Sequence, residues 1–145
     1  MKNKIFIDTN FLLDIMITDR PNSGAAFSFF KSIDGHHEPH VAVCAGSLKD
    51  AYYISRHDLS ETKRRNWIRR FTDAFEILPI DKAVCKIAVD SDEPDFEDGI
   101  IRACAERWRA DCIVSRDAKA FLNASIPKIG TDEFISNLET KPYRS

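Results

Sequence analysis

The stretch that decides the fold is Lys4-Ile-Phe-Ile-Asp-Thr-Asn-Phe-Leu-Leu-Asp14. Its first part, residues 4–8, is a short apolar run that ends in an aspartate, which is typical of a buried strand. The residues that follow carry apolar side chains at helical spacing and predict a helix over 10–17. A strand joined to a helix by a tight turn indicates the start of an α/β fold.

The same alternation of short apolar runs and helical segments continues along the chain. Further strands are expected at 39–44, 75–80, 111–115 and 126–129. Further helices are expected at 21–33, 47–57, 81–89 and 95–109, and from Ser60, Asp117 and Thr131, the one from Asp117 being short. Pro21 is expected in the first turn of the helix at 21–33, and Ile54 on the buried side of the helix at 47–57. Ser60 and Asp81 are predicted N-caps. Because parallel strands need crossover connections, this alternation favours an α/β sandwich around a mostly parallel sheet.

Composition indicates one ordinary globular domain over 1–145. The chain has 145 residues, of which 43% are hydrophobic and 30% charged, and it has no internal repeat or linker. No signal peptide and no run of about 20 apolar residues is present, so we expect a cytoplasmic protein that does not span a membrane. The four cysteines form no CxxC pair and are expected to be reduced thiols. A net charge of −2 excludes a global positive field for nucleic acid.

Five aspartates are placed where an α/β fold can bring them together. Asp8 and Asp117 follow predicted strands, and the carboxyl ends of parallel strands meet at one edge of the sheet. Asp95 and Asp98 are three residues apart at a helix start, and Asp50 lies on the helix after the second strand. Crowded carboxylates repel one another, and Mg²⁺ or Mn²⁺ prefers oxygen ligands. A divalent-metal site is therefore predicted here.

Each of these aspartates also has a purely structural interpretation. Asp95, Asp98 and Asp117 lie near presumed helix N-termini, where capping and the helix dipole favour aspartate. Asp8 can cap the next helix, and Asp50 alone fits a solvated helix position. The sequence leaves both interpretations open.

Three segments resemble the acidic motifs of the PIN-domain ribonucleases, in the same order and at similar spacing. They are Ile5-Phe-Ile-Asp-Thr-Asn-Phe-Leu-Leu-Asp14, Asp95-Phe-Glu-Asp-Gly-Ile-Ile101 and Cys112-Ile-Val-Ser-Arg-Asp117. The resemblance is greatest to bacterial PIN proteins that include VapC-type toxins. It implies a three-layer α/β/α sandwich with a central, mostly parallel sheet. It also implies Mg²⁺- or Mn²⁺-dependent cleavage of single-stranded RNA, frequent homodimers, and an antitoxin partner if the chain is a toxin.

The resemblance assigns roles residue by residue. Asp8, Asp98 and Asp117 match the first, third and fourth acidic ligands, and Asp95 matches an additional aspartate of many members. The second motif usually supplies a glutamate, for which we assign Asp50 in Ser47-Leu-Lys-Asp-Ala-Tyr-Tyr-Ile54. The catalytic set expected from the resemblance is therefore Asp8, Asp50, Asp98 and Asp117, and the metal ligands are Asp8, Asp95, Asp98 and Asp117. Gly99 also departs from the family pattern, in which a helix former is usual.

Other polar residues have roles that the sequence leaves open. Thr9, Asn10 and Ser115 adjoin the acidic residues and can orient the carboxylates or form local caps. Arg116 is expected to contact a phosphate. The basic segment around Trp67 is either an RNA contact or a solvated helix face with the ring turned inward; its basic residues are Lys63, Arg64, Arg65, Arg69 and Arg70.

The leading functional hypothesis is a metal-dependent endoribonuclease, with a toxin of a toxin–antitoxin pair as one form of it. A second hypothesis is a catalytically weak PIN-fold module that binds RNA or protein, which the aspartate at the second motif favours. A third is a phosphatase that uses Asp8 as its nucleophile and forms a covalent aspartyl-phosphate.

Overall fold

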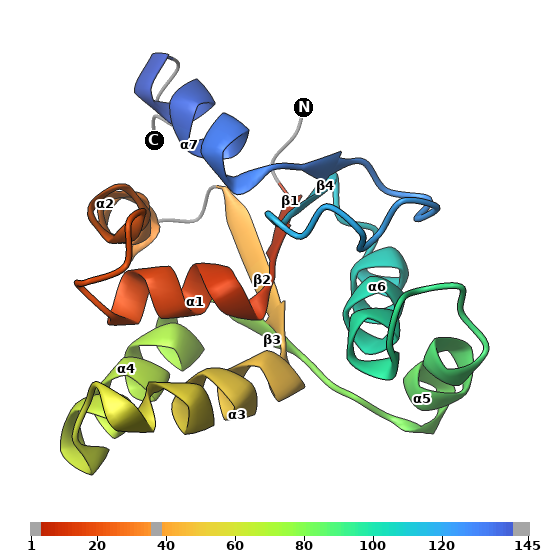
Figure 1. Cartoon of the computed structure of the whole chain (residues 1–145), viewed down its shortest axis with the longest axis horizontal. Helices are drawn as coiled ribbons and strands as arrows, with labels where there is room; N and C mark the ends of the chain where they lie inside the picture. The colour runs from red at the N-terminus through yellow and green to blue at the C-terminus, as the bar shows by residue number, and fades with distance from the viewer. Residues whose placement is uncertain (1–3, 36–38, 141–145) are drawn as a thin grey trace.

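A single parallel sheet forms the centre of the molecule. The computed structural model describes residues 4–35 and 39–140 and contains five strands in the order β3-β2-β1-β4-β5 (Figure 1). The pairings β1–β2, β1–β4, β2–β3 and β4–β5 are all parallel. The strands are β1 (Lys4–Ile7), β2 (His40–Cys44), β3 (Glu76–Leu78), β4 (Cys112–Val114) and β5 (Lys128–Ile129). The predicted parallel sheet is confirmed.

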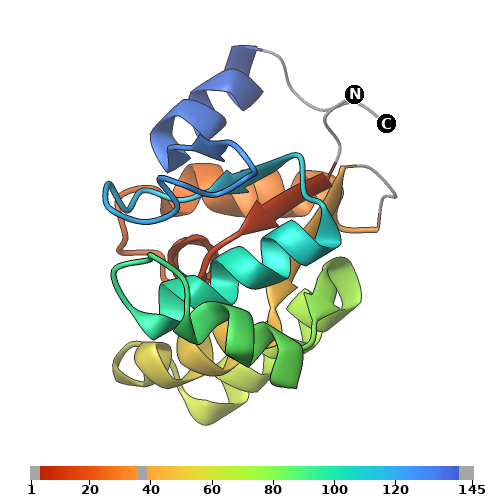
Figure 2. The same ribbon diagram turned by 90° about the vertical axis from the view of Figure 1, so that its right-hand side faces the viewer.

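Helices cover both faces of the sheet, as the two views in Figure 1 and Figure 2 show. In Figure 1, α1 to α4 lie on one side of the sheet, and α5 and α6 lie on the other. They are α1 (Thr9–Met16), α2 (Ser23–Ile33), α3 (Ala45–Ile54), α4 (Glu61–Ala74), α5 (Lys82–Val89), α6 (Phe96–Trp108) and α7 (Thr131–Thr140), with a 3-10 turn η1 (Ser55–His57) after α3. In the described ranges, no helix is both long and apolar enough to cross a membrane. The predicted three-layer α/β/α arrangement is confirmed.

Strand alternation divides the apolar interior into two cores. Ile5 and Ile7 face the side of α1 and α2, whereas Phe6 faces the side of α6. The first core is rich in aromatic rings, and within it Trp67 stacks on Phe71 with ring centroids 5.5 Å apart. Trp67 is therefore turned inward, as the structural interpretation of the basic segment expected.

Side-chain caps start several of the helices. Asp8 accepts a hydrogen bond from the Phe11 amide, and Asp95 accepts one from the Asp98 amide. The predicted N-caps Ser60 and Asp81 are confirmed, because their side chains accept hydrogen bonds from Lys63 N and Val84 N.

The short helix predicted from Asp117 is not formed. Residues 118–123 make consecutive turns, and Phe121 has a φ of 65°. The Phe121 amide donates to the Glu93 carboxylate at 2.7 Å, so a tertiary partner replaces the helical hydrogen bond. The Lys128 ammonium also donates to the carbonyls of Asp117 and Ala120.

Two smaller expectations are wrong. Pro21 lies before α2 instead of in its first turn, because the Ser23 amide bonds to Arg20 O and closes a turn at residues 20–23. Ile54 is exposed instead of buried, because the end of α3 lines a surface cavity.

Gly99 allows α5 and α6 to pack closely. A Cβ atom at this position would lie 2.7 Å from Ala88 O and 2.8 Å from Ser91 Oγ. Real Cβ atoms do not approach backbone oxygens so closely, so the glycine that the helix pattern disfavours is required by the contact.

Replacing glycine by alanine at two helical positions tests this explanation. Gly99→Ala should lower the free energy of unfolding by about 1–3 kcal/mol, because the added methyl overpacks the α5–α6 contact. Gly24→Ala is the matched control, since nothing lies within 4 Å of its Cβ position, and it should raise that free energy by roughly 0.5 kcal/mol. Urea denaturation measures both. Equal effects of the two substitutions would contradict the packing explanation.

Candidate active site

The pairing of β1 with β4 places the first functional side chains next to each other. Ile7 pairs with Val114, so the next residues, Asp8 and Ser115, emerge together at the carboxyl edge of the sheet. The Ser115 hydroxyl hydrogen-bonds the Asp8 carboxylate, and the Asp117 amide donates to Ser115 Oγ at 3.2 Å. A short polar chain therefore links Asp8 to the residue that carries the next carboxylate.

A cavity of about 650 Å³ opens at this edge. Four of the predicted carboxylates line it: Asp8 from the end of β1, Asp50 from α3, Asp98 from α6 and Asp117 from the loop after β4. The polar residues Thr9, Asn10 and Ser115 line it as well. Its remaining walls are largely apolar and include Tyr53, Ile54, Ile80, Phe96, Ile100, Ile101 and Phe121.

Two of the polar neighbours have hydrogen-bond partners of their own. The Thr9 hydroxyl donates to Ser47 Oγ at 3.0 Å and thereby joins α1 to α3 at the cavity wall. The Asn10 side chain accepts a hydrogen bond from Arg20 at 3.3 Å. The Thr9–Ser47 hydrogen bond therefore joins α1, whose N-cap is Asp8, to α3, which carries Asp50.

Asp95 lies just outside the cavity lining. Its carboxylate caps α6 by accepting the Asp98 amide at 2.8 Å. Its negative charge nevertheless acts on Asp98. The structure thus gives Asp95 a capping contact and leaves it close enough to influence the site.

Burial and crowding alter the acidity of the carboxylates. Asp8 is only 6% exposed, and burial raises its pKa, while the hydrogen bonds from Ser115 and Phe11 and the charge of Arg116 act in the opposite direction. Burial, together with the charges of Asp95 and Asp117, raises the pKa of Asp98 to about 6. Because like charges disfavour ionisation, a cation in this cavity would relieve the repulsion.

The carboxylates share the cavity without forming a closed cage. Across residues 4–35 and 39–140, no three His, Cys, Asp or Glu side chains are close enough to hold an ion between them. All the acidic donors in the cavity are nevertheless oxygen atoms, which suit Mg²⁺ or Mn²⁺. Mg²⁺ in particular keeps several waters and needs only one or two carboxylates. The residues present therefore fit a hydrated divalent cation.

An ion pair between a buried aspartate and a partly exposed arginine holds the start of the loop that carries Asp117. Asp14 is 0% exposed, and Arg116 donates to both of its carboxylate oxygens at 2.7 and 2.8 Å. Arg20 donates to the same carboxylate at 2.7 Å. Arg116, expected to contact a phosphate, thus has a protein partner that the sequence pattern did not indicate, and it lies near enough for its charge to act on Asp8.

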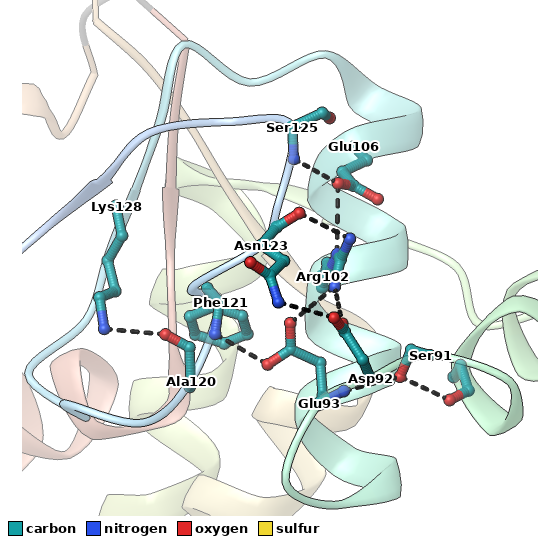
Figure 3. A network of polar contacts seen from close by, with 11 residues as sticks. Ser91, Asp92, Glu93, Arg102, Glu106, Ala120, Phe121, Asn123, Ser125 and Lys128 are labelled. Atoms are coloured by element: carbon teal, nitrogen blue, oxygen red, sulfur yellow. Dashed lines mark hydrogen bonds and ion pairs between the residues drawn. The ribbon is translucent and has the colours of Figure 1, made fainter.

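A second network holds the far part of the same loop, as Figure 3 shows. Arg102 on α6 donates to Asp92 at 2.6 Å, to Glu93 at 3.0 Å and to the Asn123 carbonyl at 2.9 Å. The Glu93 side chain is almost fully buried and accepts the amide of Phe121. Residues 116–125 are therefore attached to α6, the helix that carries Asp98.

The basic segment of α4 lies outside this cavity, because none of its basic residues lines it. Arg64 and Arg65 pair with Glu61, and Arg70 lies 3.9 Å from Asp34. Arg69 donates to Asn66. Lys63, Arg64, Arg65, Arg69 and Arg70 are thus separate from the acidic cavity.

Several cavity residues were not expected from the sequence. Tyr53, Phe96, Lys49 and Cys44 all line it. One signal was present for Tyr53, since Tyr52 and Tyr53 are consecutive on a helix and cannot both face the interior. All four cysteines are free thiols, as expected, and a hydrogen bond with Cys104 lowers the pKa of Cys44 to about 7.

Comparison with solved structures shows where this fold occurs. The VapC20 toxin of Mycobacterium tuberculosis, described as cleaving the sarcin–ricin loop, aligns with a TM-score of 0.65 and 16% identity over 79% of this chain and 90% of that chain. FitAcB of Neisseria gonorrhoeae aligns with a TM-score of 0.61 and 21% identity, over 86% of this chain and 96% of that chain. A toxin–antitoxin complex of Klebsiella pneumoniae aligns with a TM-score of 0.62 and 19% identity, over 83% of this chain and 92% of that chain.

Sequence comparison places the chain in a family. No curated protein matches the sequence significantly. The family model described as PIN domain matches residues 4–119, a range that contains β1 to β4 and every carboxylate that lines the cavity. The chain belongs to the PIN domain family.

Proposed function

We propose that the protein is a Mg²⁺- or Mn²⁺-dependent endoribonuclease that cleaves single-stranded RNA. The observation that carries this proposal is the convergence of Asp8, Asp50, Asp98 and Asp117 on one cavity at the carboxyl edge of the sheet. The raised pKa of Asp98, to about 6, supports it. Burial is the largest cause of that shift, and the neighbouring negative charges that add to it also favour cation binding.

Asp8, Asp98 and Asp117 would hold the cation, with Asp95 adding negative charge beside Asp98. When bound, such an ion supplies Lewis acidity that activates water and neutralises charge on a phosphodiester. Asp50 faces the same cavity from α3 and takes the place of the family's usual glutamate. The Ser115 hydroxyl keeps the Asp8 carboxylate oriented through its hydrogen bond.

We also propose a partner protein and a homodimer. The solved structures with this fold include a toxin–antitoxin complex and a FitAB complex bound to DNA, which supports the proposal of a partner. The proposal for this chain is a toxin whose ribonuclease is blocked by an antitoxin in the cytoplasm. The homodimer is proposed from the family resemblance, and both proposals are separate from the metal chemistry.

A binding module that does not cleave is the second candidate. Two observations favour it. The second acidic position carries an aspartate, and among the described residues no three His, Cys, Asp or Glu side chains are arranged so that they could hold one metal ion. The phosphatase hypothesis is less well supported. Asp8 is almost buried and its carboxylate is engaged by Ser115 and by the Phe11 amide, which leaves it poorly placed as a nucleophile.

Removing single charges from the cavity tests the nuclease. Asp8→Asn and Asp50→Asn should each lower Mn²⁺-dependent cleavage of a single-stranded RNA by about 10–100-fold or more, a loss known even for outer partners of a metal. Asp73→Asn on α4 is the matched control, because Asp73 is exposed and outside the cavity, and it should cleave normally. The measurement is the initial cleavage rate with Mn²⁺ and with EDTA.

The outcomes separate the candidates. Full activity of Asp50→Asn with loss in Asp8→Asn removes Asp50 from the site. Cleavage that survives EDTA contradicts the metal dependence. A pure wild-type protein that cuts no RNA contradicts the nuclease and favours the binding module.

Cation binding should also depend on pH. The folded-state pKa of Asp98 lies above its ordinary value of 3.8, so its proton stabilises the fold at low pH and this contribution is lost as pH rises towards 6. Mn²⁺ competes with that proton. At about 100 times its Kd, Mn²⁺ should raise Tm by roughly 5–10 °C at pH 7.5 and by clearly less at pH 5.

Thermal unfolding followed by circular dichroism measures these shifts. Asp98→Asn is the control, and its response to Mn²⁺ should be smaller and should vary less between the two pH values. A wild-type Tm that millimolar Mn²⁺ leaves unchanged at pH 7.5 would contradict a metal site in this cavity.

A further inference from the structure

Two aromatic rings are exposed within the acidic cavity. Tyr53 of α3 is 60% exposed and Phe96 of α6 is 48% exposed, and both line the cavity that contains Asp8, Asp50 and Asp98. Exposed large aromatic side chains lose the free energy that burial would provide. Trp67, the ring that the sequence pattern offered for stacking, is packed in the core instead.

We propose that Tyr53 and Phe96 form a base-stacking subsite for unpaired nucleobases of a single-stranded RNA bound across the cavity. The identity of the strand as RNA rests on the proposed function. The stacking itself rests on the position and exposure of the two rings. Flat apolar faces beside a phosphate-binding site are how proteins hold single strands without reading their sequence.

Arg56 makes the Tyr53 ring a fixed platform. The guanidinium carbon of Arg56 lies 3.7 Å from the ring centroid, and its Nη1 donates to the Tyr53 carbonyl at 2.8 Å. The guanidinium covers one face of the ring, so a base would stack on the opposite face. The cation also adds positive charge beside the strand, and its contact with the ring limits the entropy that binding would cost.

Phe96 occupies the corresponding place at the start of α6. It is the first residue of the helix, directly after the cap Asp95 and two residues before Asp98. A hydrocarbon ring has no hydrogen bond to make there, so only apolar or stacking contacts can satisfy it. A base stacked on Phe96 would therefore belong to a nucleotide whose phosphate is near the carboxylates.

The cavity lining is acidic overall, so a polyanion would be held there by the divalent cation of the proposed function together with two basic side chains on the α3 side. Lys49 lines the cavity with its side chain 83% exposed, and its ammonium lies 3.7 Å from Asp50. Lys49 and Arg56 thus place two cations on the α3 side of the cavity, where a phosphate backbone would pass. A protein segment with apolar side chains is the other possible occupant, and the test below separates the two.

The experiment measures affinity for single-stranded RNA without cleavage. A fluorescent uridine-rich oligonucleotide and an abasic oligonucleotide of the same length are titrated at low salt with Ca²⁺ in place of Mn²⁺, so that the carboxylates are neutralised. Fluorescence anisotropy is the readout, and gel electrophoresis checks that the strands stay intact. Tyr53→Leu and Phe96→Leu keep an apolar side chain but remove the aromatic face. Each should weaken binding of the normal oligonucleotide by about 5- to 100-fold, and the abasic one much less.

Two controls make the comparison specific. Tyr53→Phe keeps the ring and should bind RNA as the wild type does. Ile87→Ala removes an exposed apolar side chain of α5 that does not line the cavity, and it should change nothing. A 2-aminopurine base in the oligonucleotide should lose fluorescence on binding to the wild type and lose less on binding to the leucine variants.

Several results would overturn the proposal. These are equal affinity of the wild type for the normal and abasic strands, leucine variants that bind like the wild type, and the absence of any RNA binding. Leucine variants that keep RNA affinity but lose a partner protein would assign the rings to that partner instead. A wild type that stacks bases but cleaves nothing with Mn²⁺ would contradict the nuclease and leave the stacking subsite supported.

Discussion

The parallel pairing of β1 with β4 is the contact on which the rest of the site depends. Ile5 pairs with Cys112, 107 residues further along the chain, and the pairing brings Asp8 and Ser115 to the same edge. Ser115 then links the Asp8 carboxylate to the backbone at Asp117. A parallel sheet gathers its functional residues at one edge because its strands all end there. The acidic cavity is a direct consequence of that topology.

The loop after β4 has to be fixed for this edge to work, and no helix fixes it. Arg116 binds the fully buried Asp14 at the start of the loop, and Arg102 connects the loop to α6 through Glu93 and Asn123. The Asp14 carboxylate is fully buried, so the loss of Arg116 would leave a buried charge with Arg20 as its remaining partner and would destabilise the fold. The site is therefore held by charged tertiary contacts on two sides, with Asp98 and Asp117 brought near each other between them.

The sequence indicated most of the architecture and the acidic residues, because those features are local. Asp8 after an apolar run and Asp81 before a helix can both be recognised within a few residues. The partner of Arg116 and the turn at Phe121 could not be recognised, since each depends on a residue distant in the chain. Gly99 is the clearest case, because it disagrees with helix propensity and is explained only by its contact with Ala88. Local patterns specify elements, and tertiary contacts specify which side chains reach the cavity.

The central claim is that the carboxylates at this edge hold a divalent cation. Crystals of the wild-type protein grown with Mn²⁺, with anomalous diffraction measured near the manganese absorption edge, test it most directly. We expect an anomalous peak in the cavity, in contact with the carboxylates of Asp8, Asp98 and Asp117. A peak only at other surface carboxylates, or no peak in the cavity at saturating Mn²⁺, would contradict it.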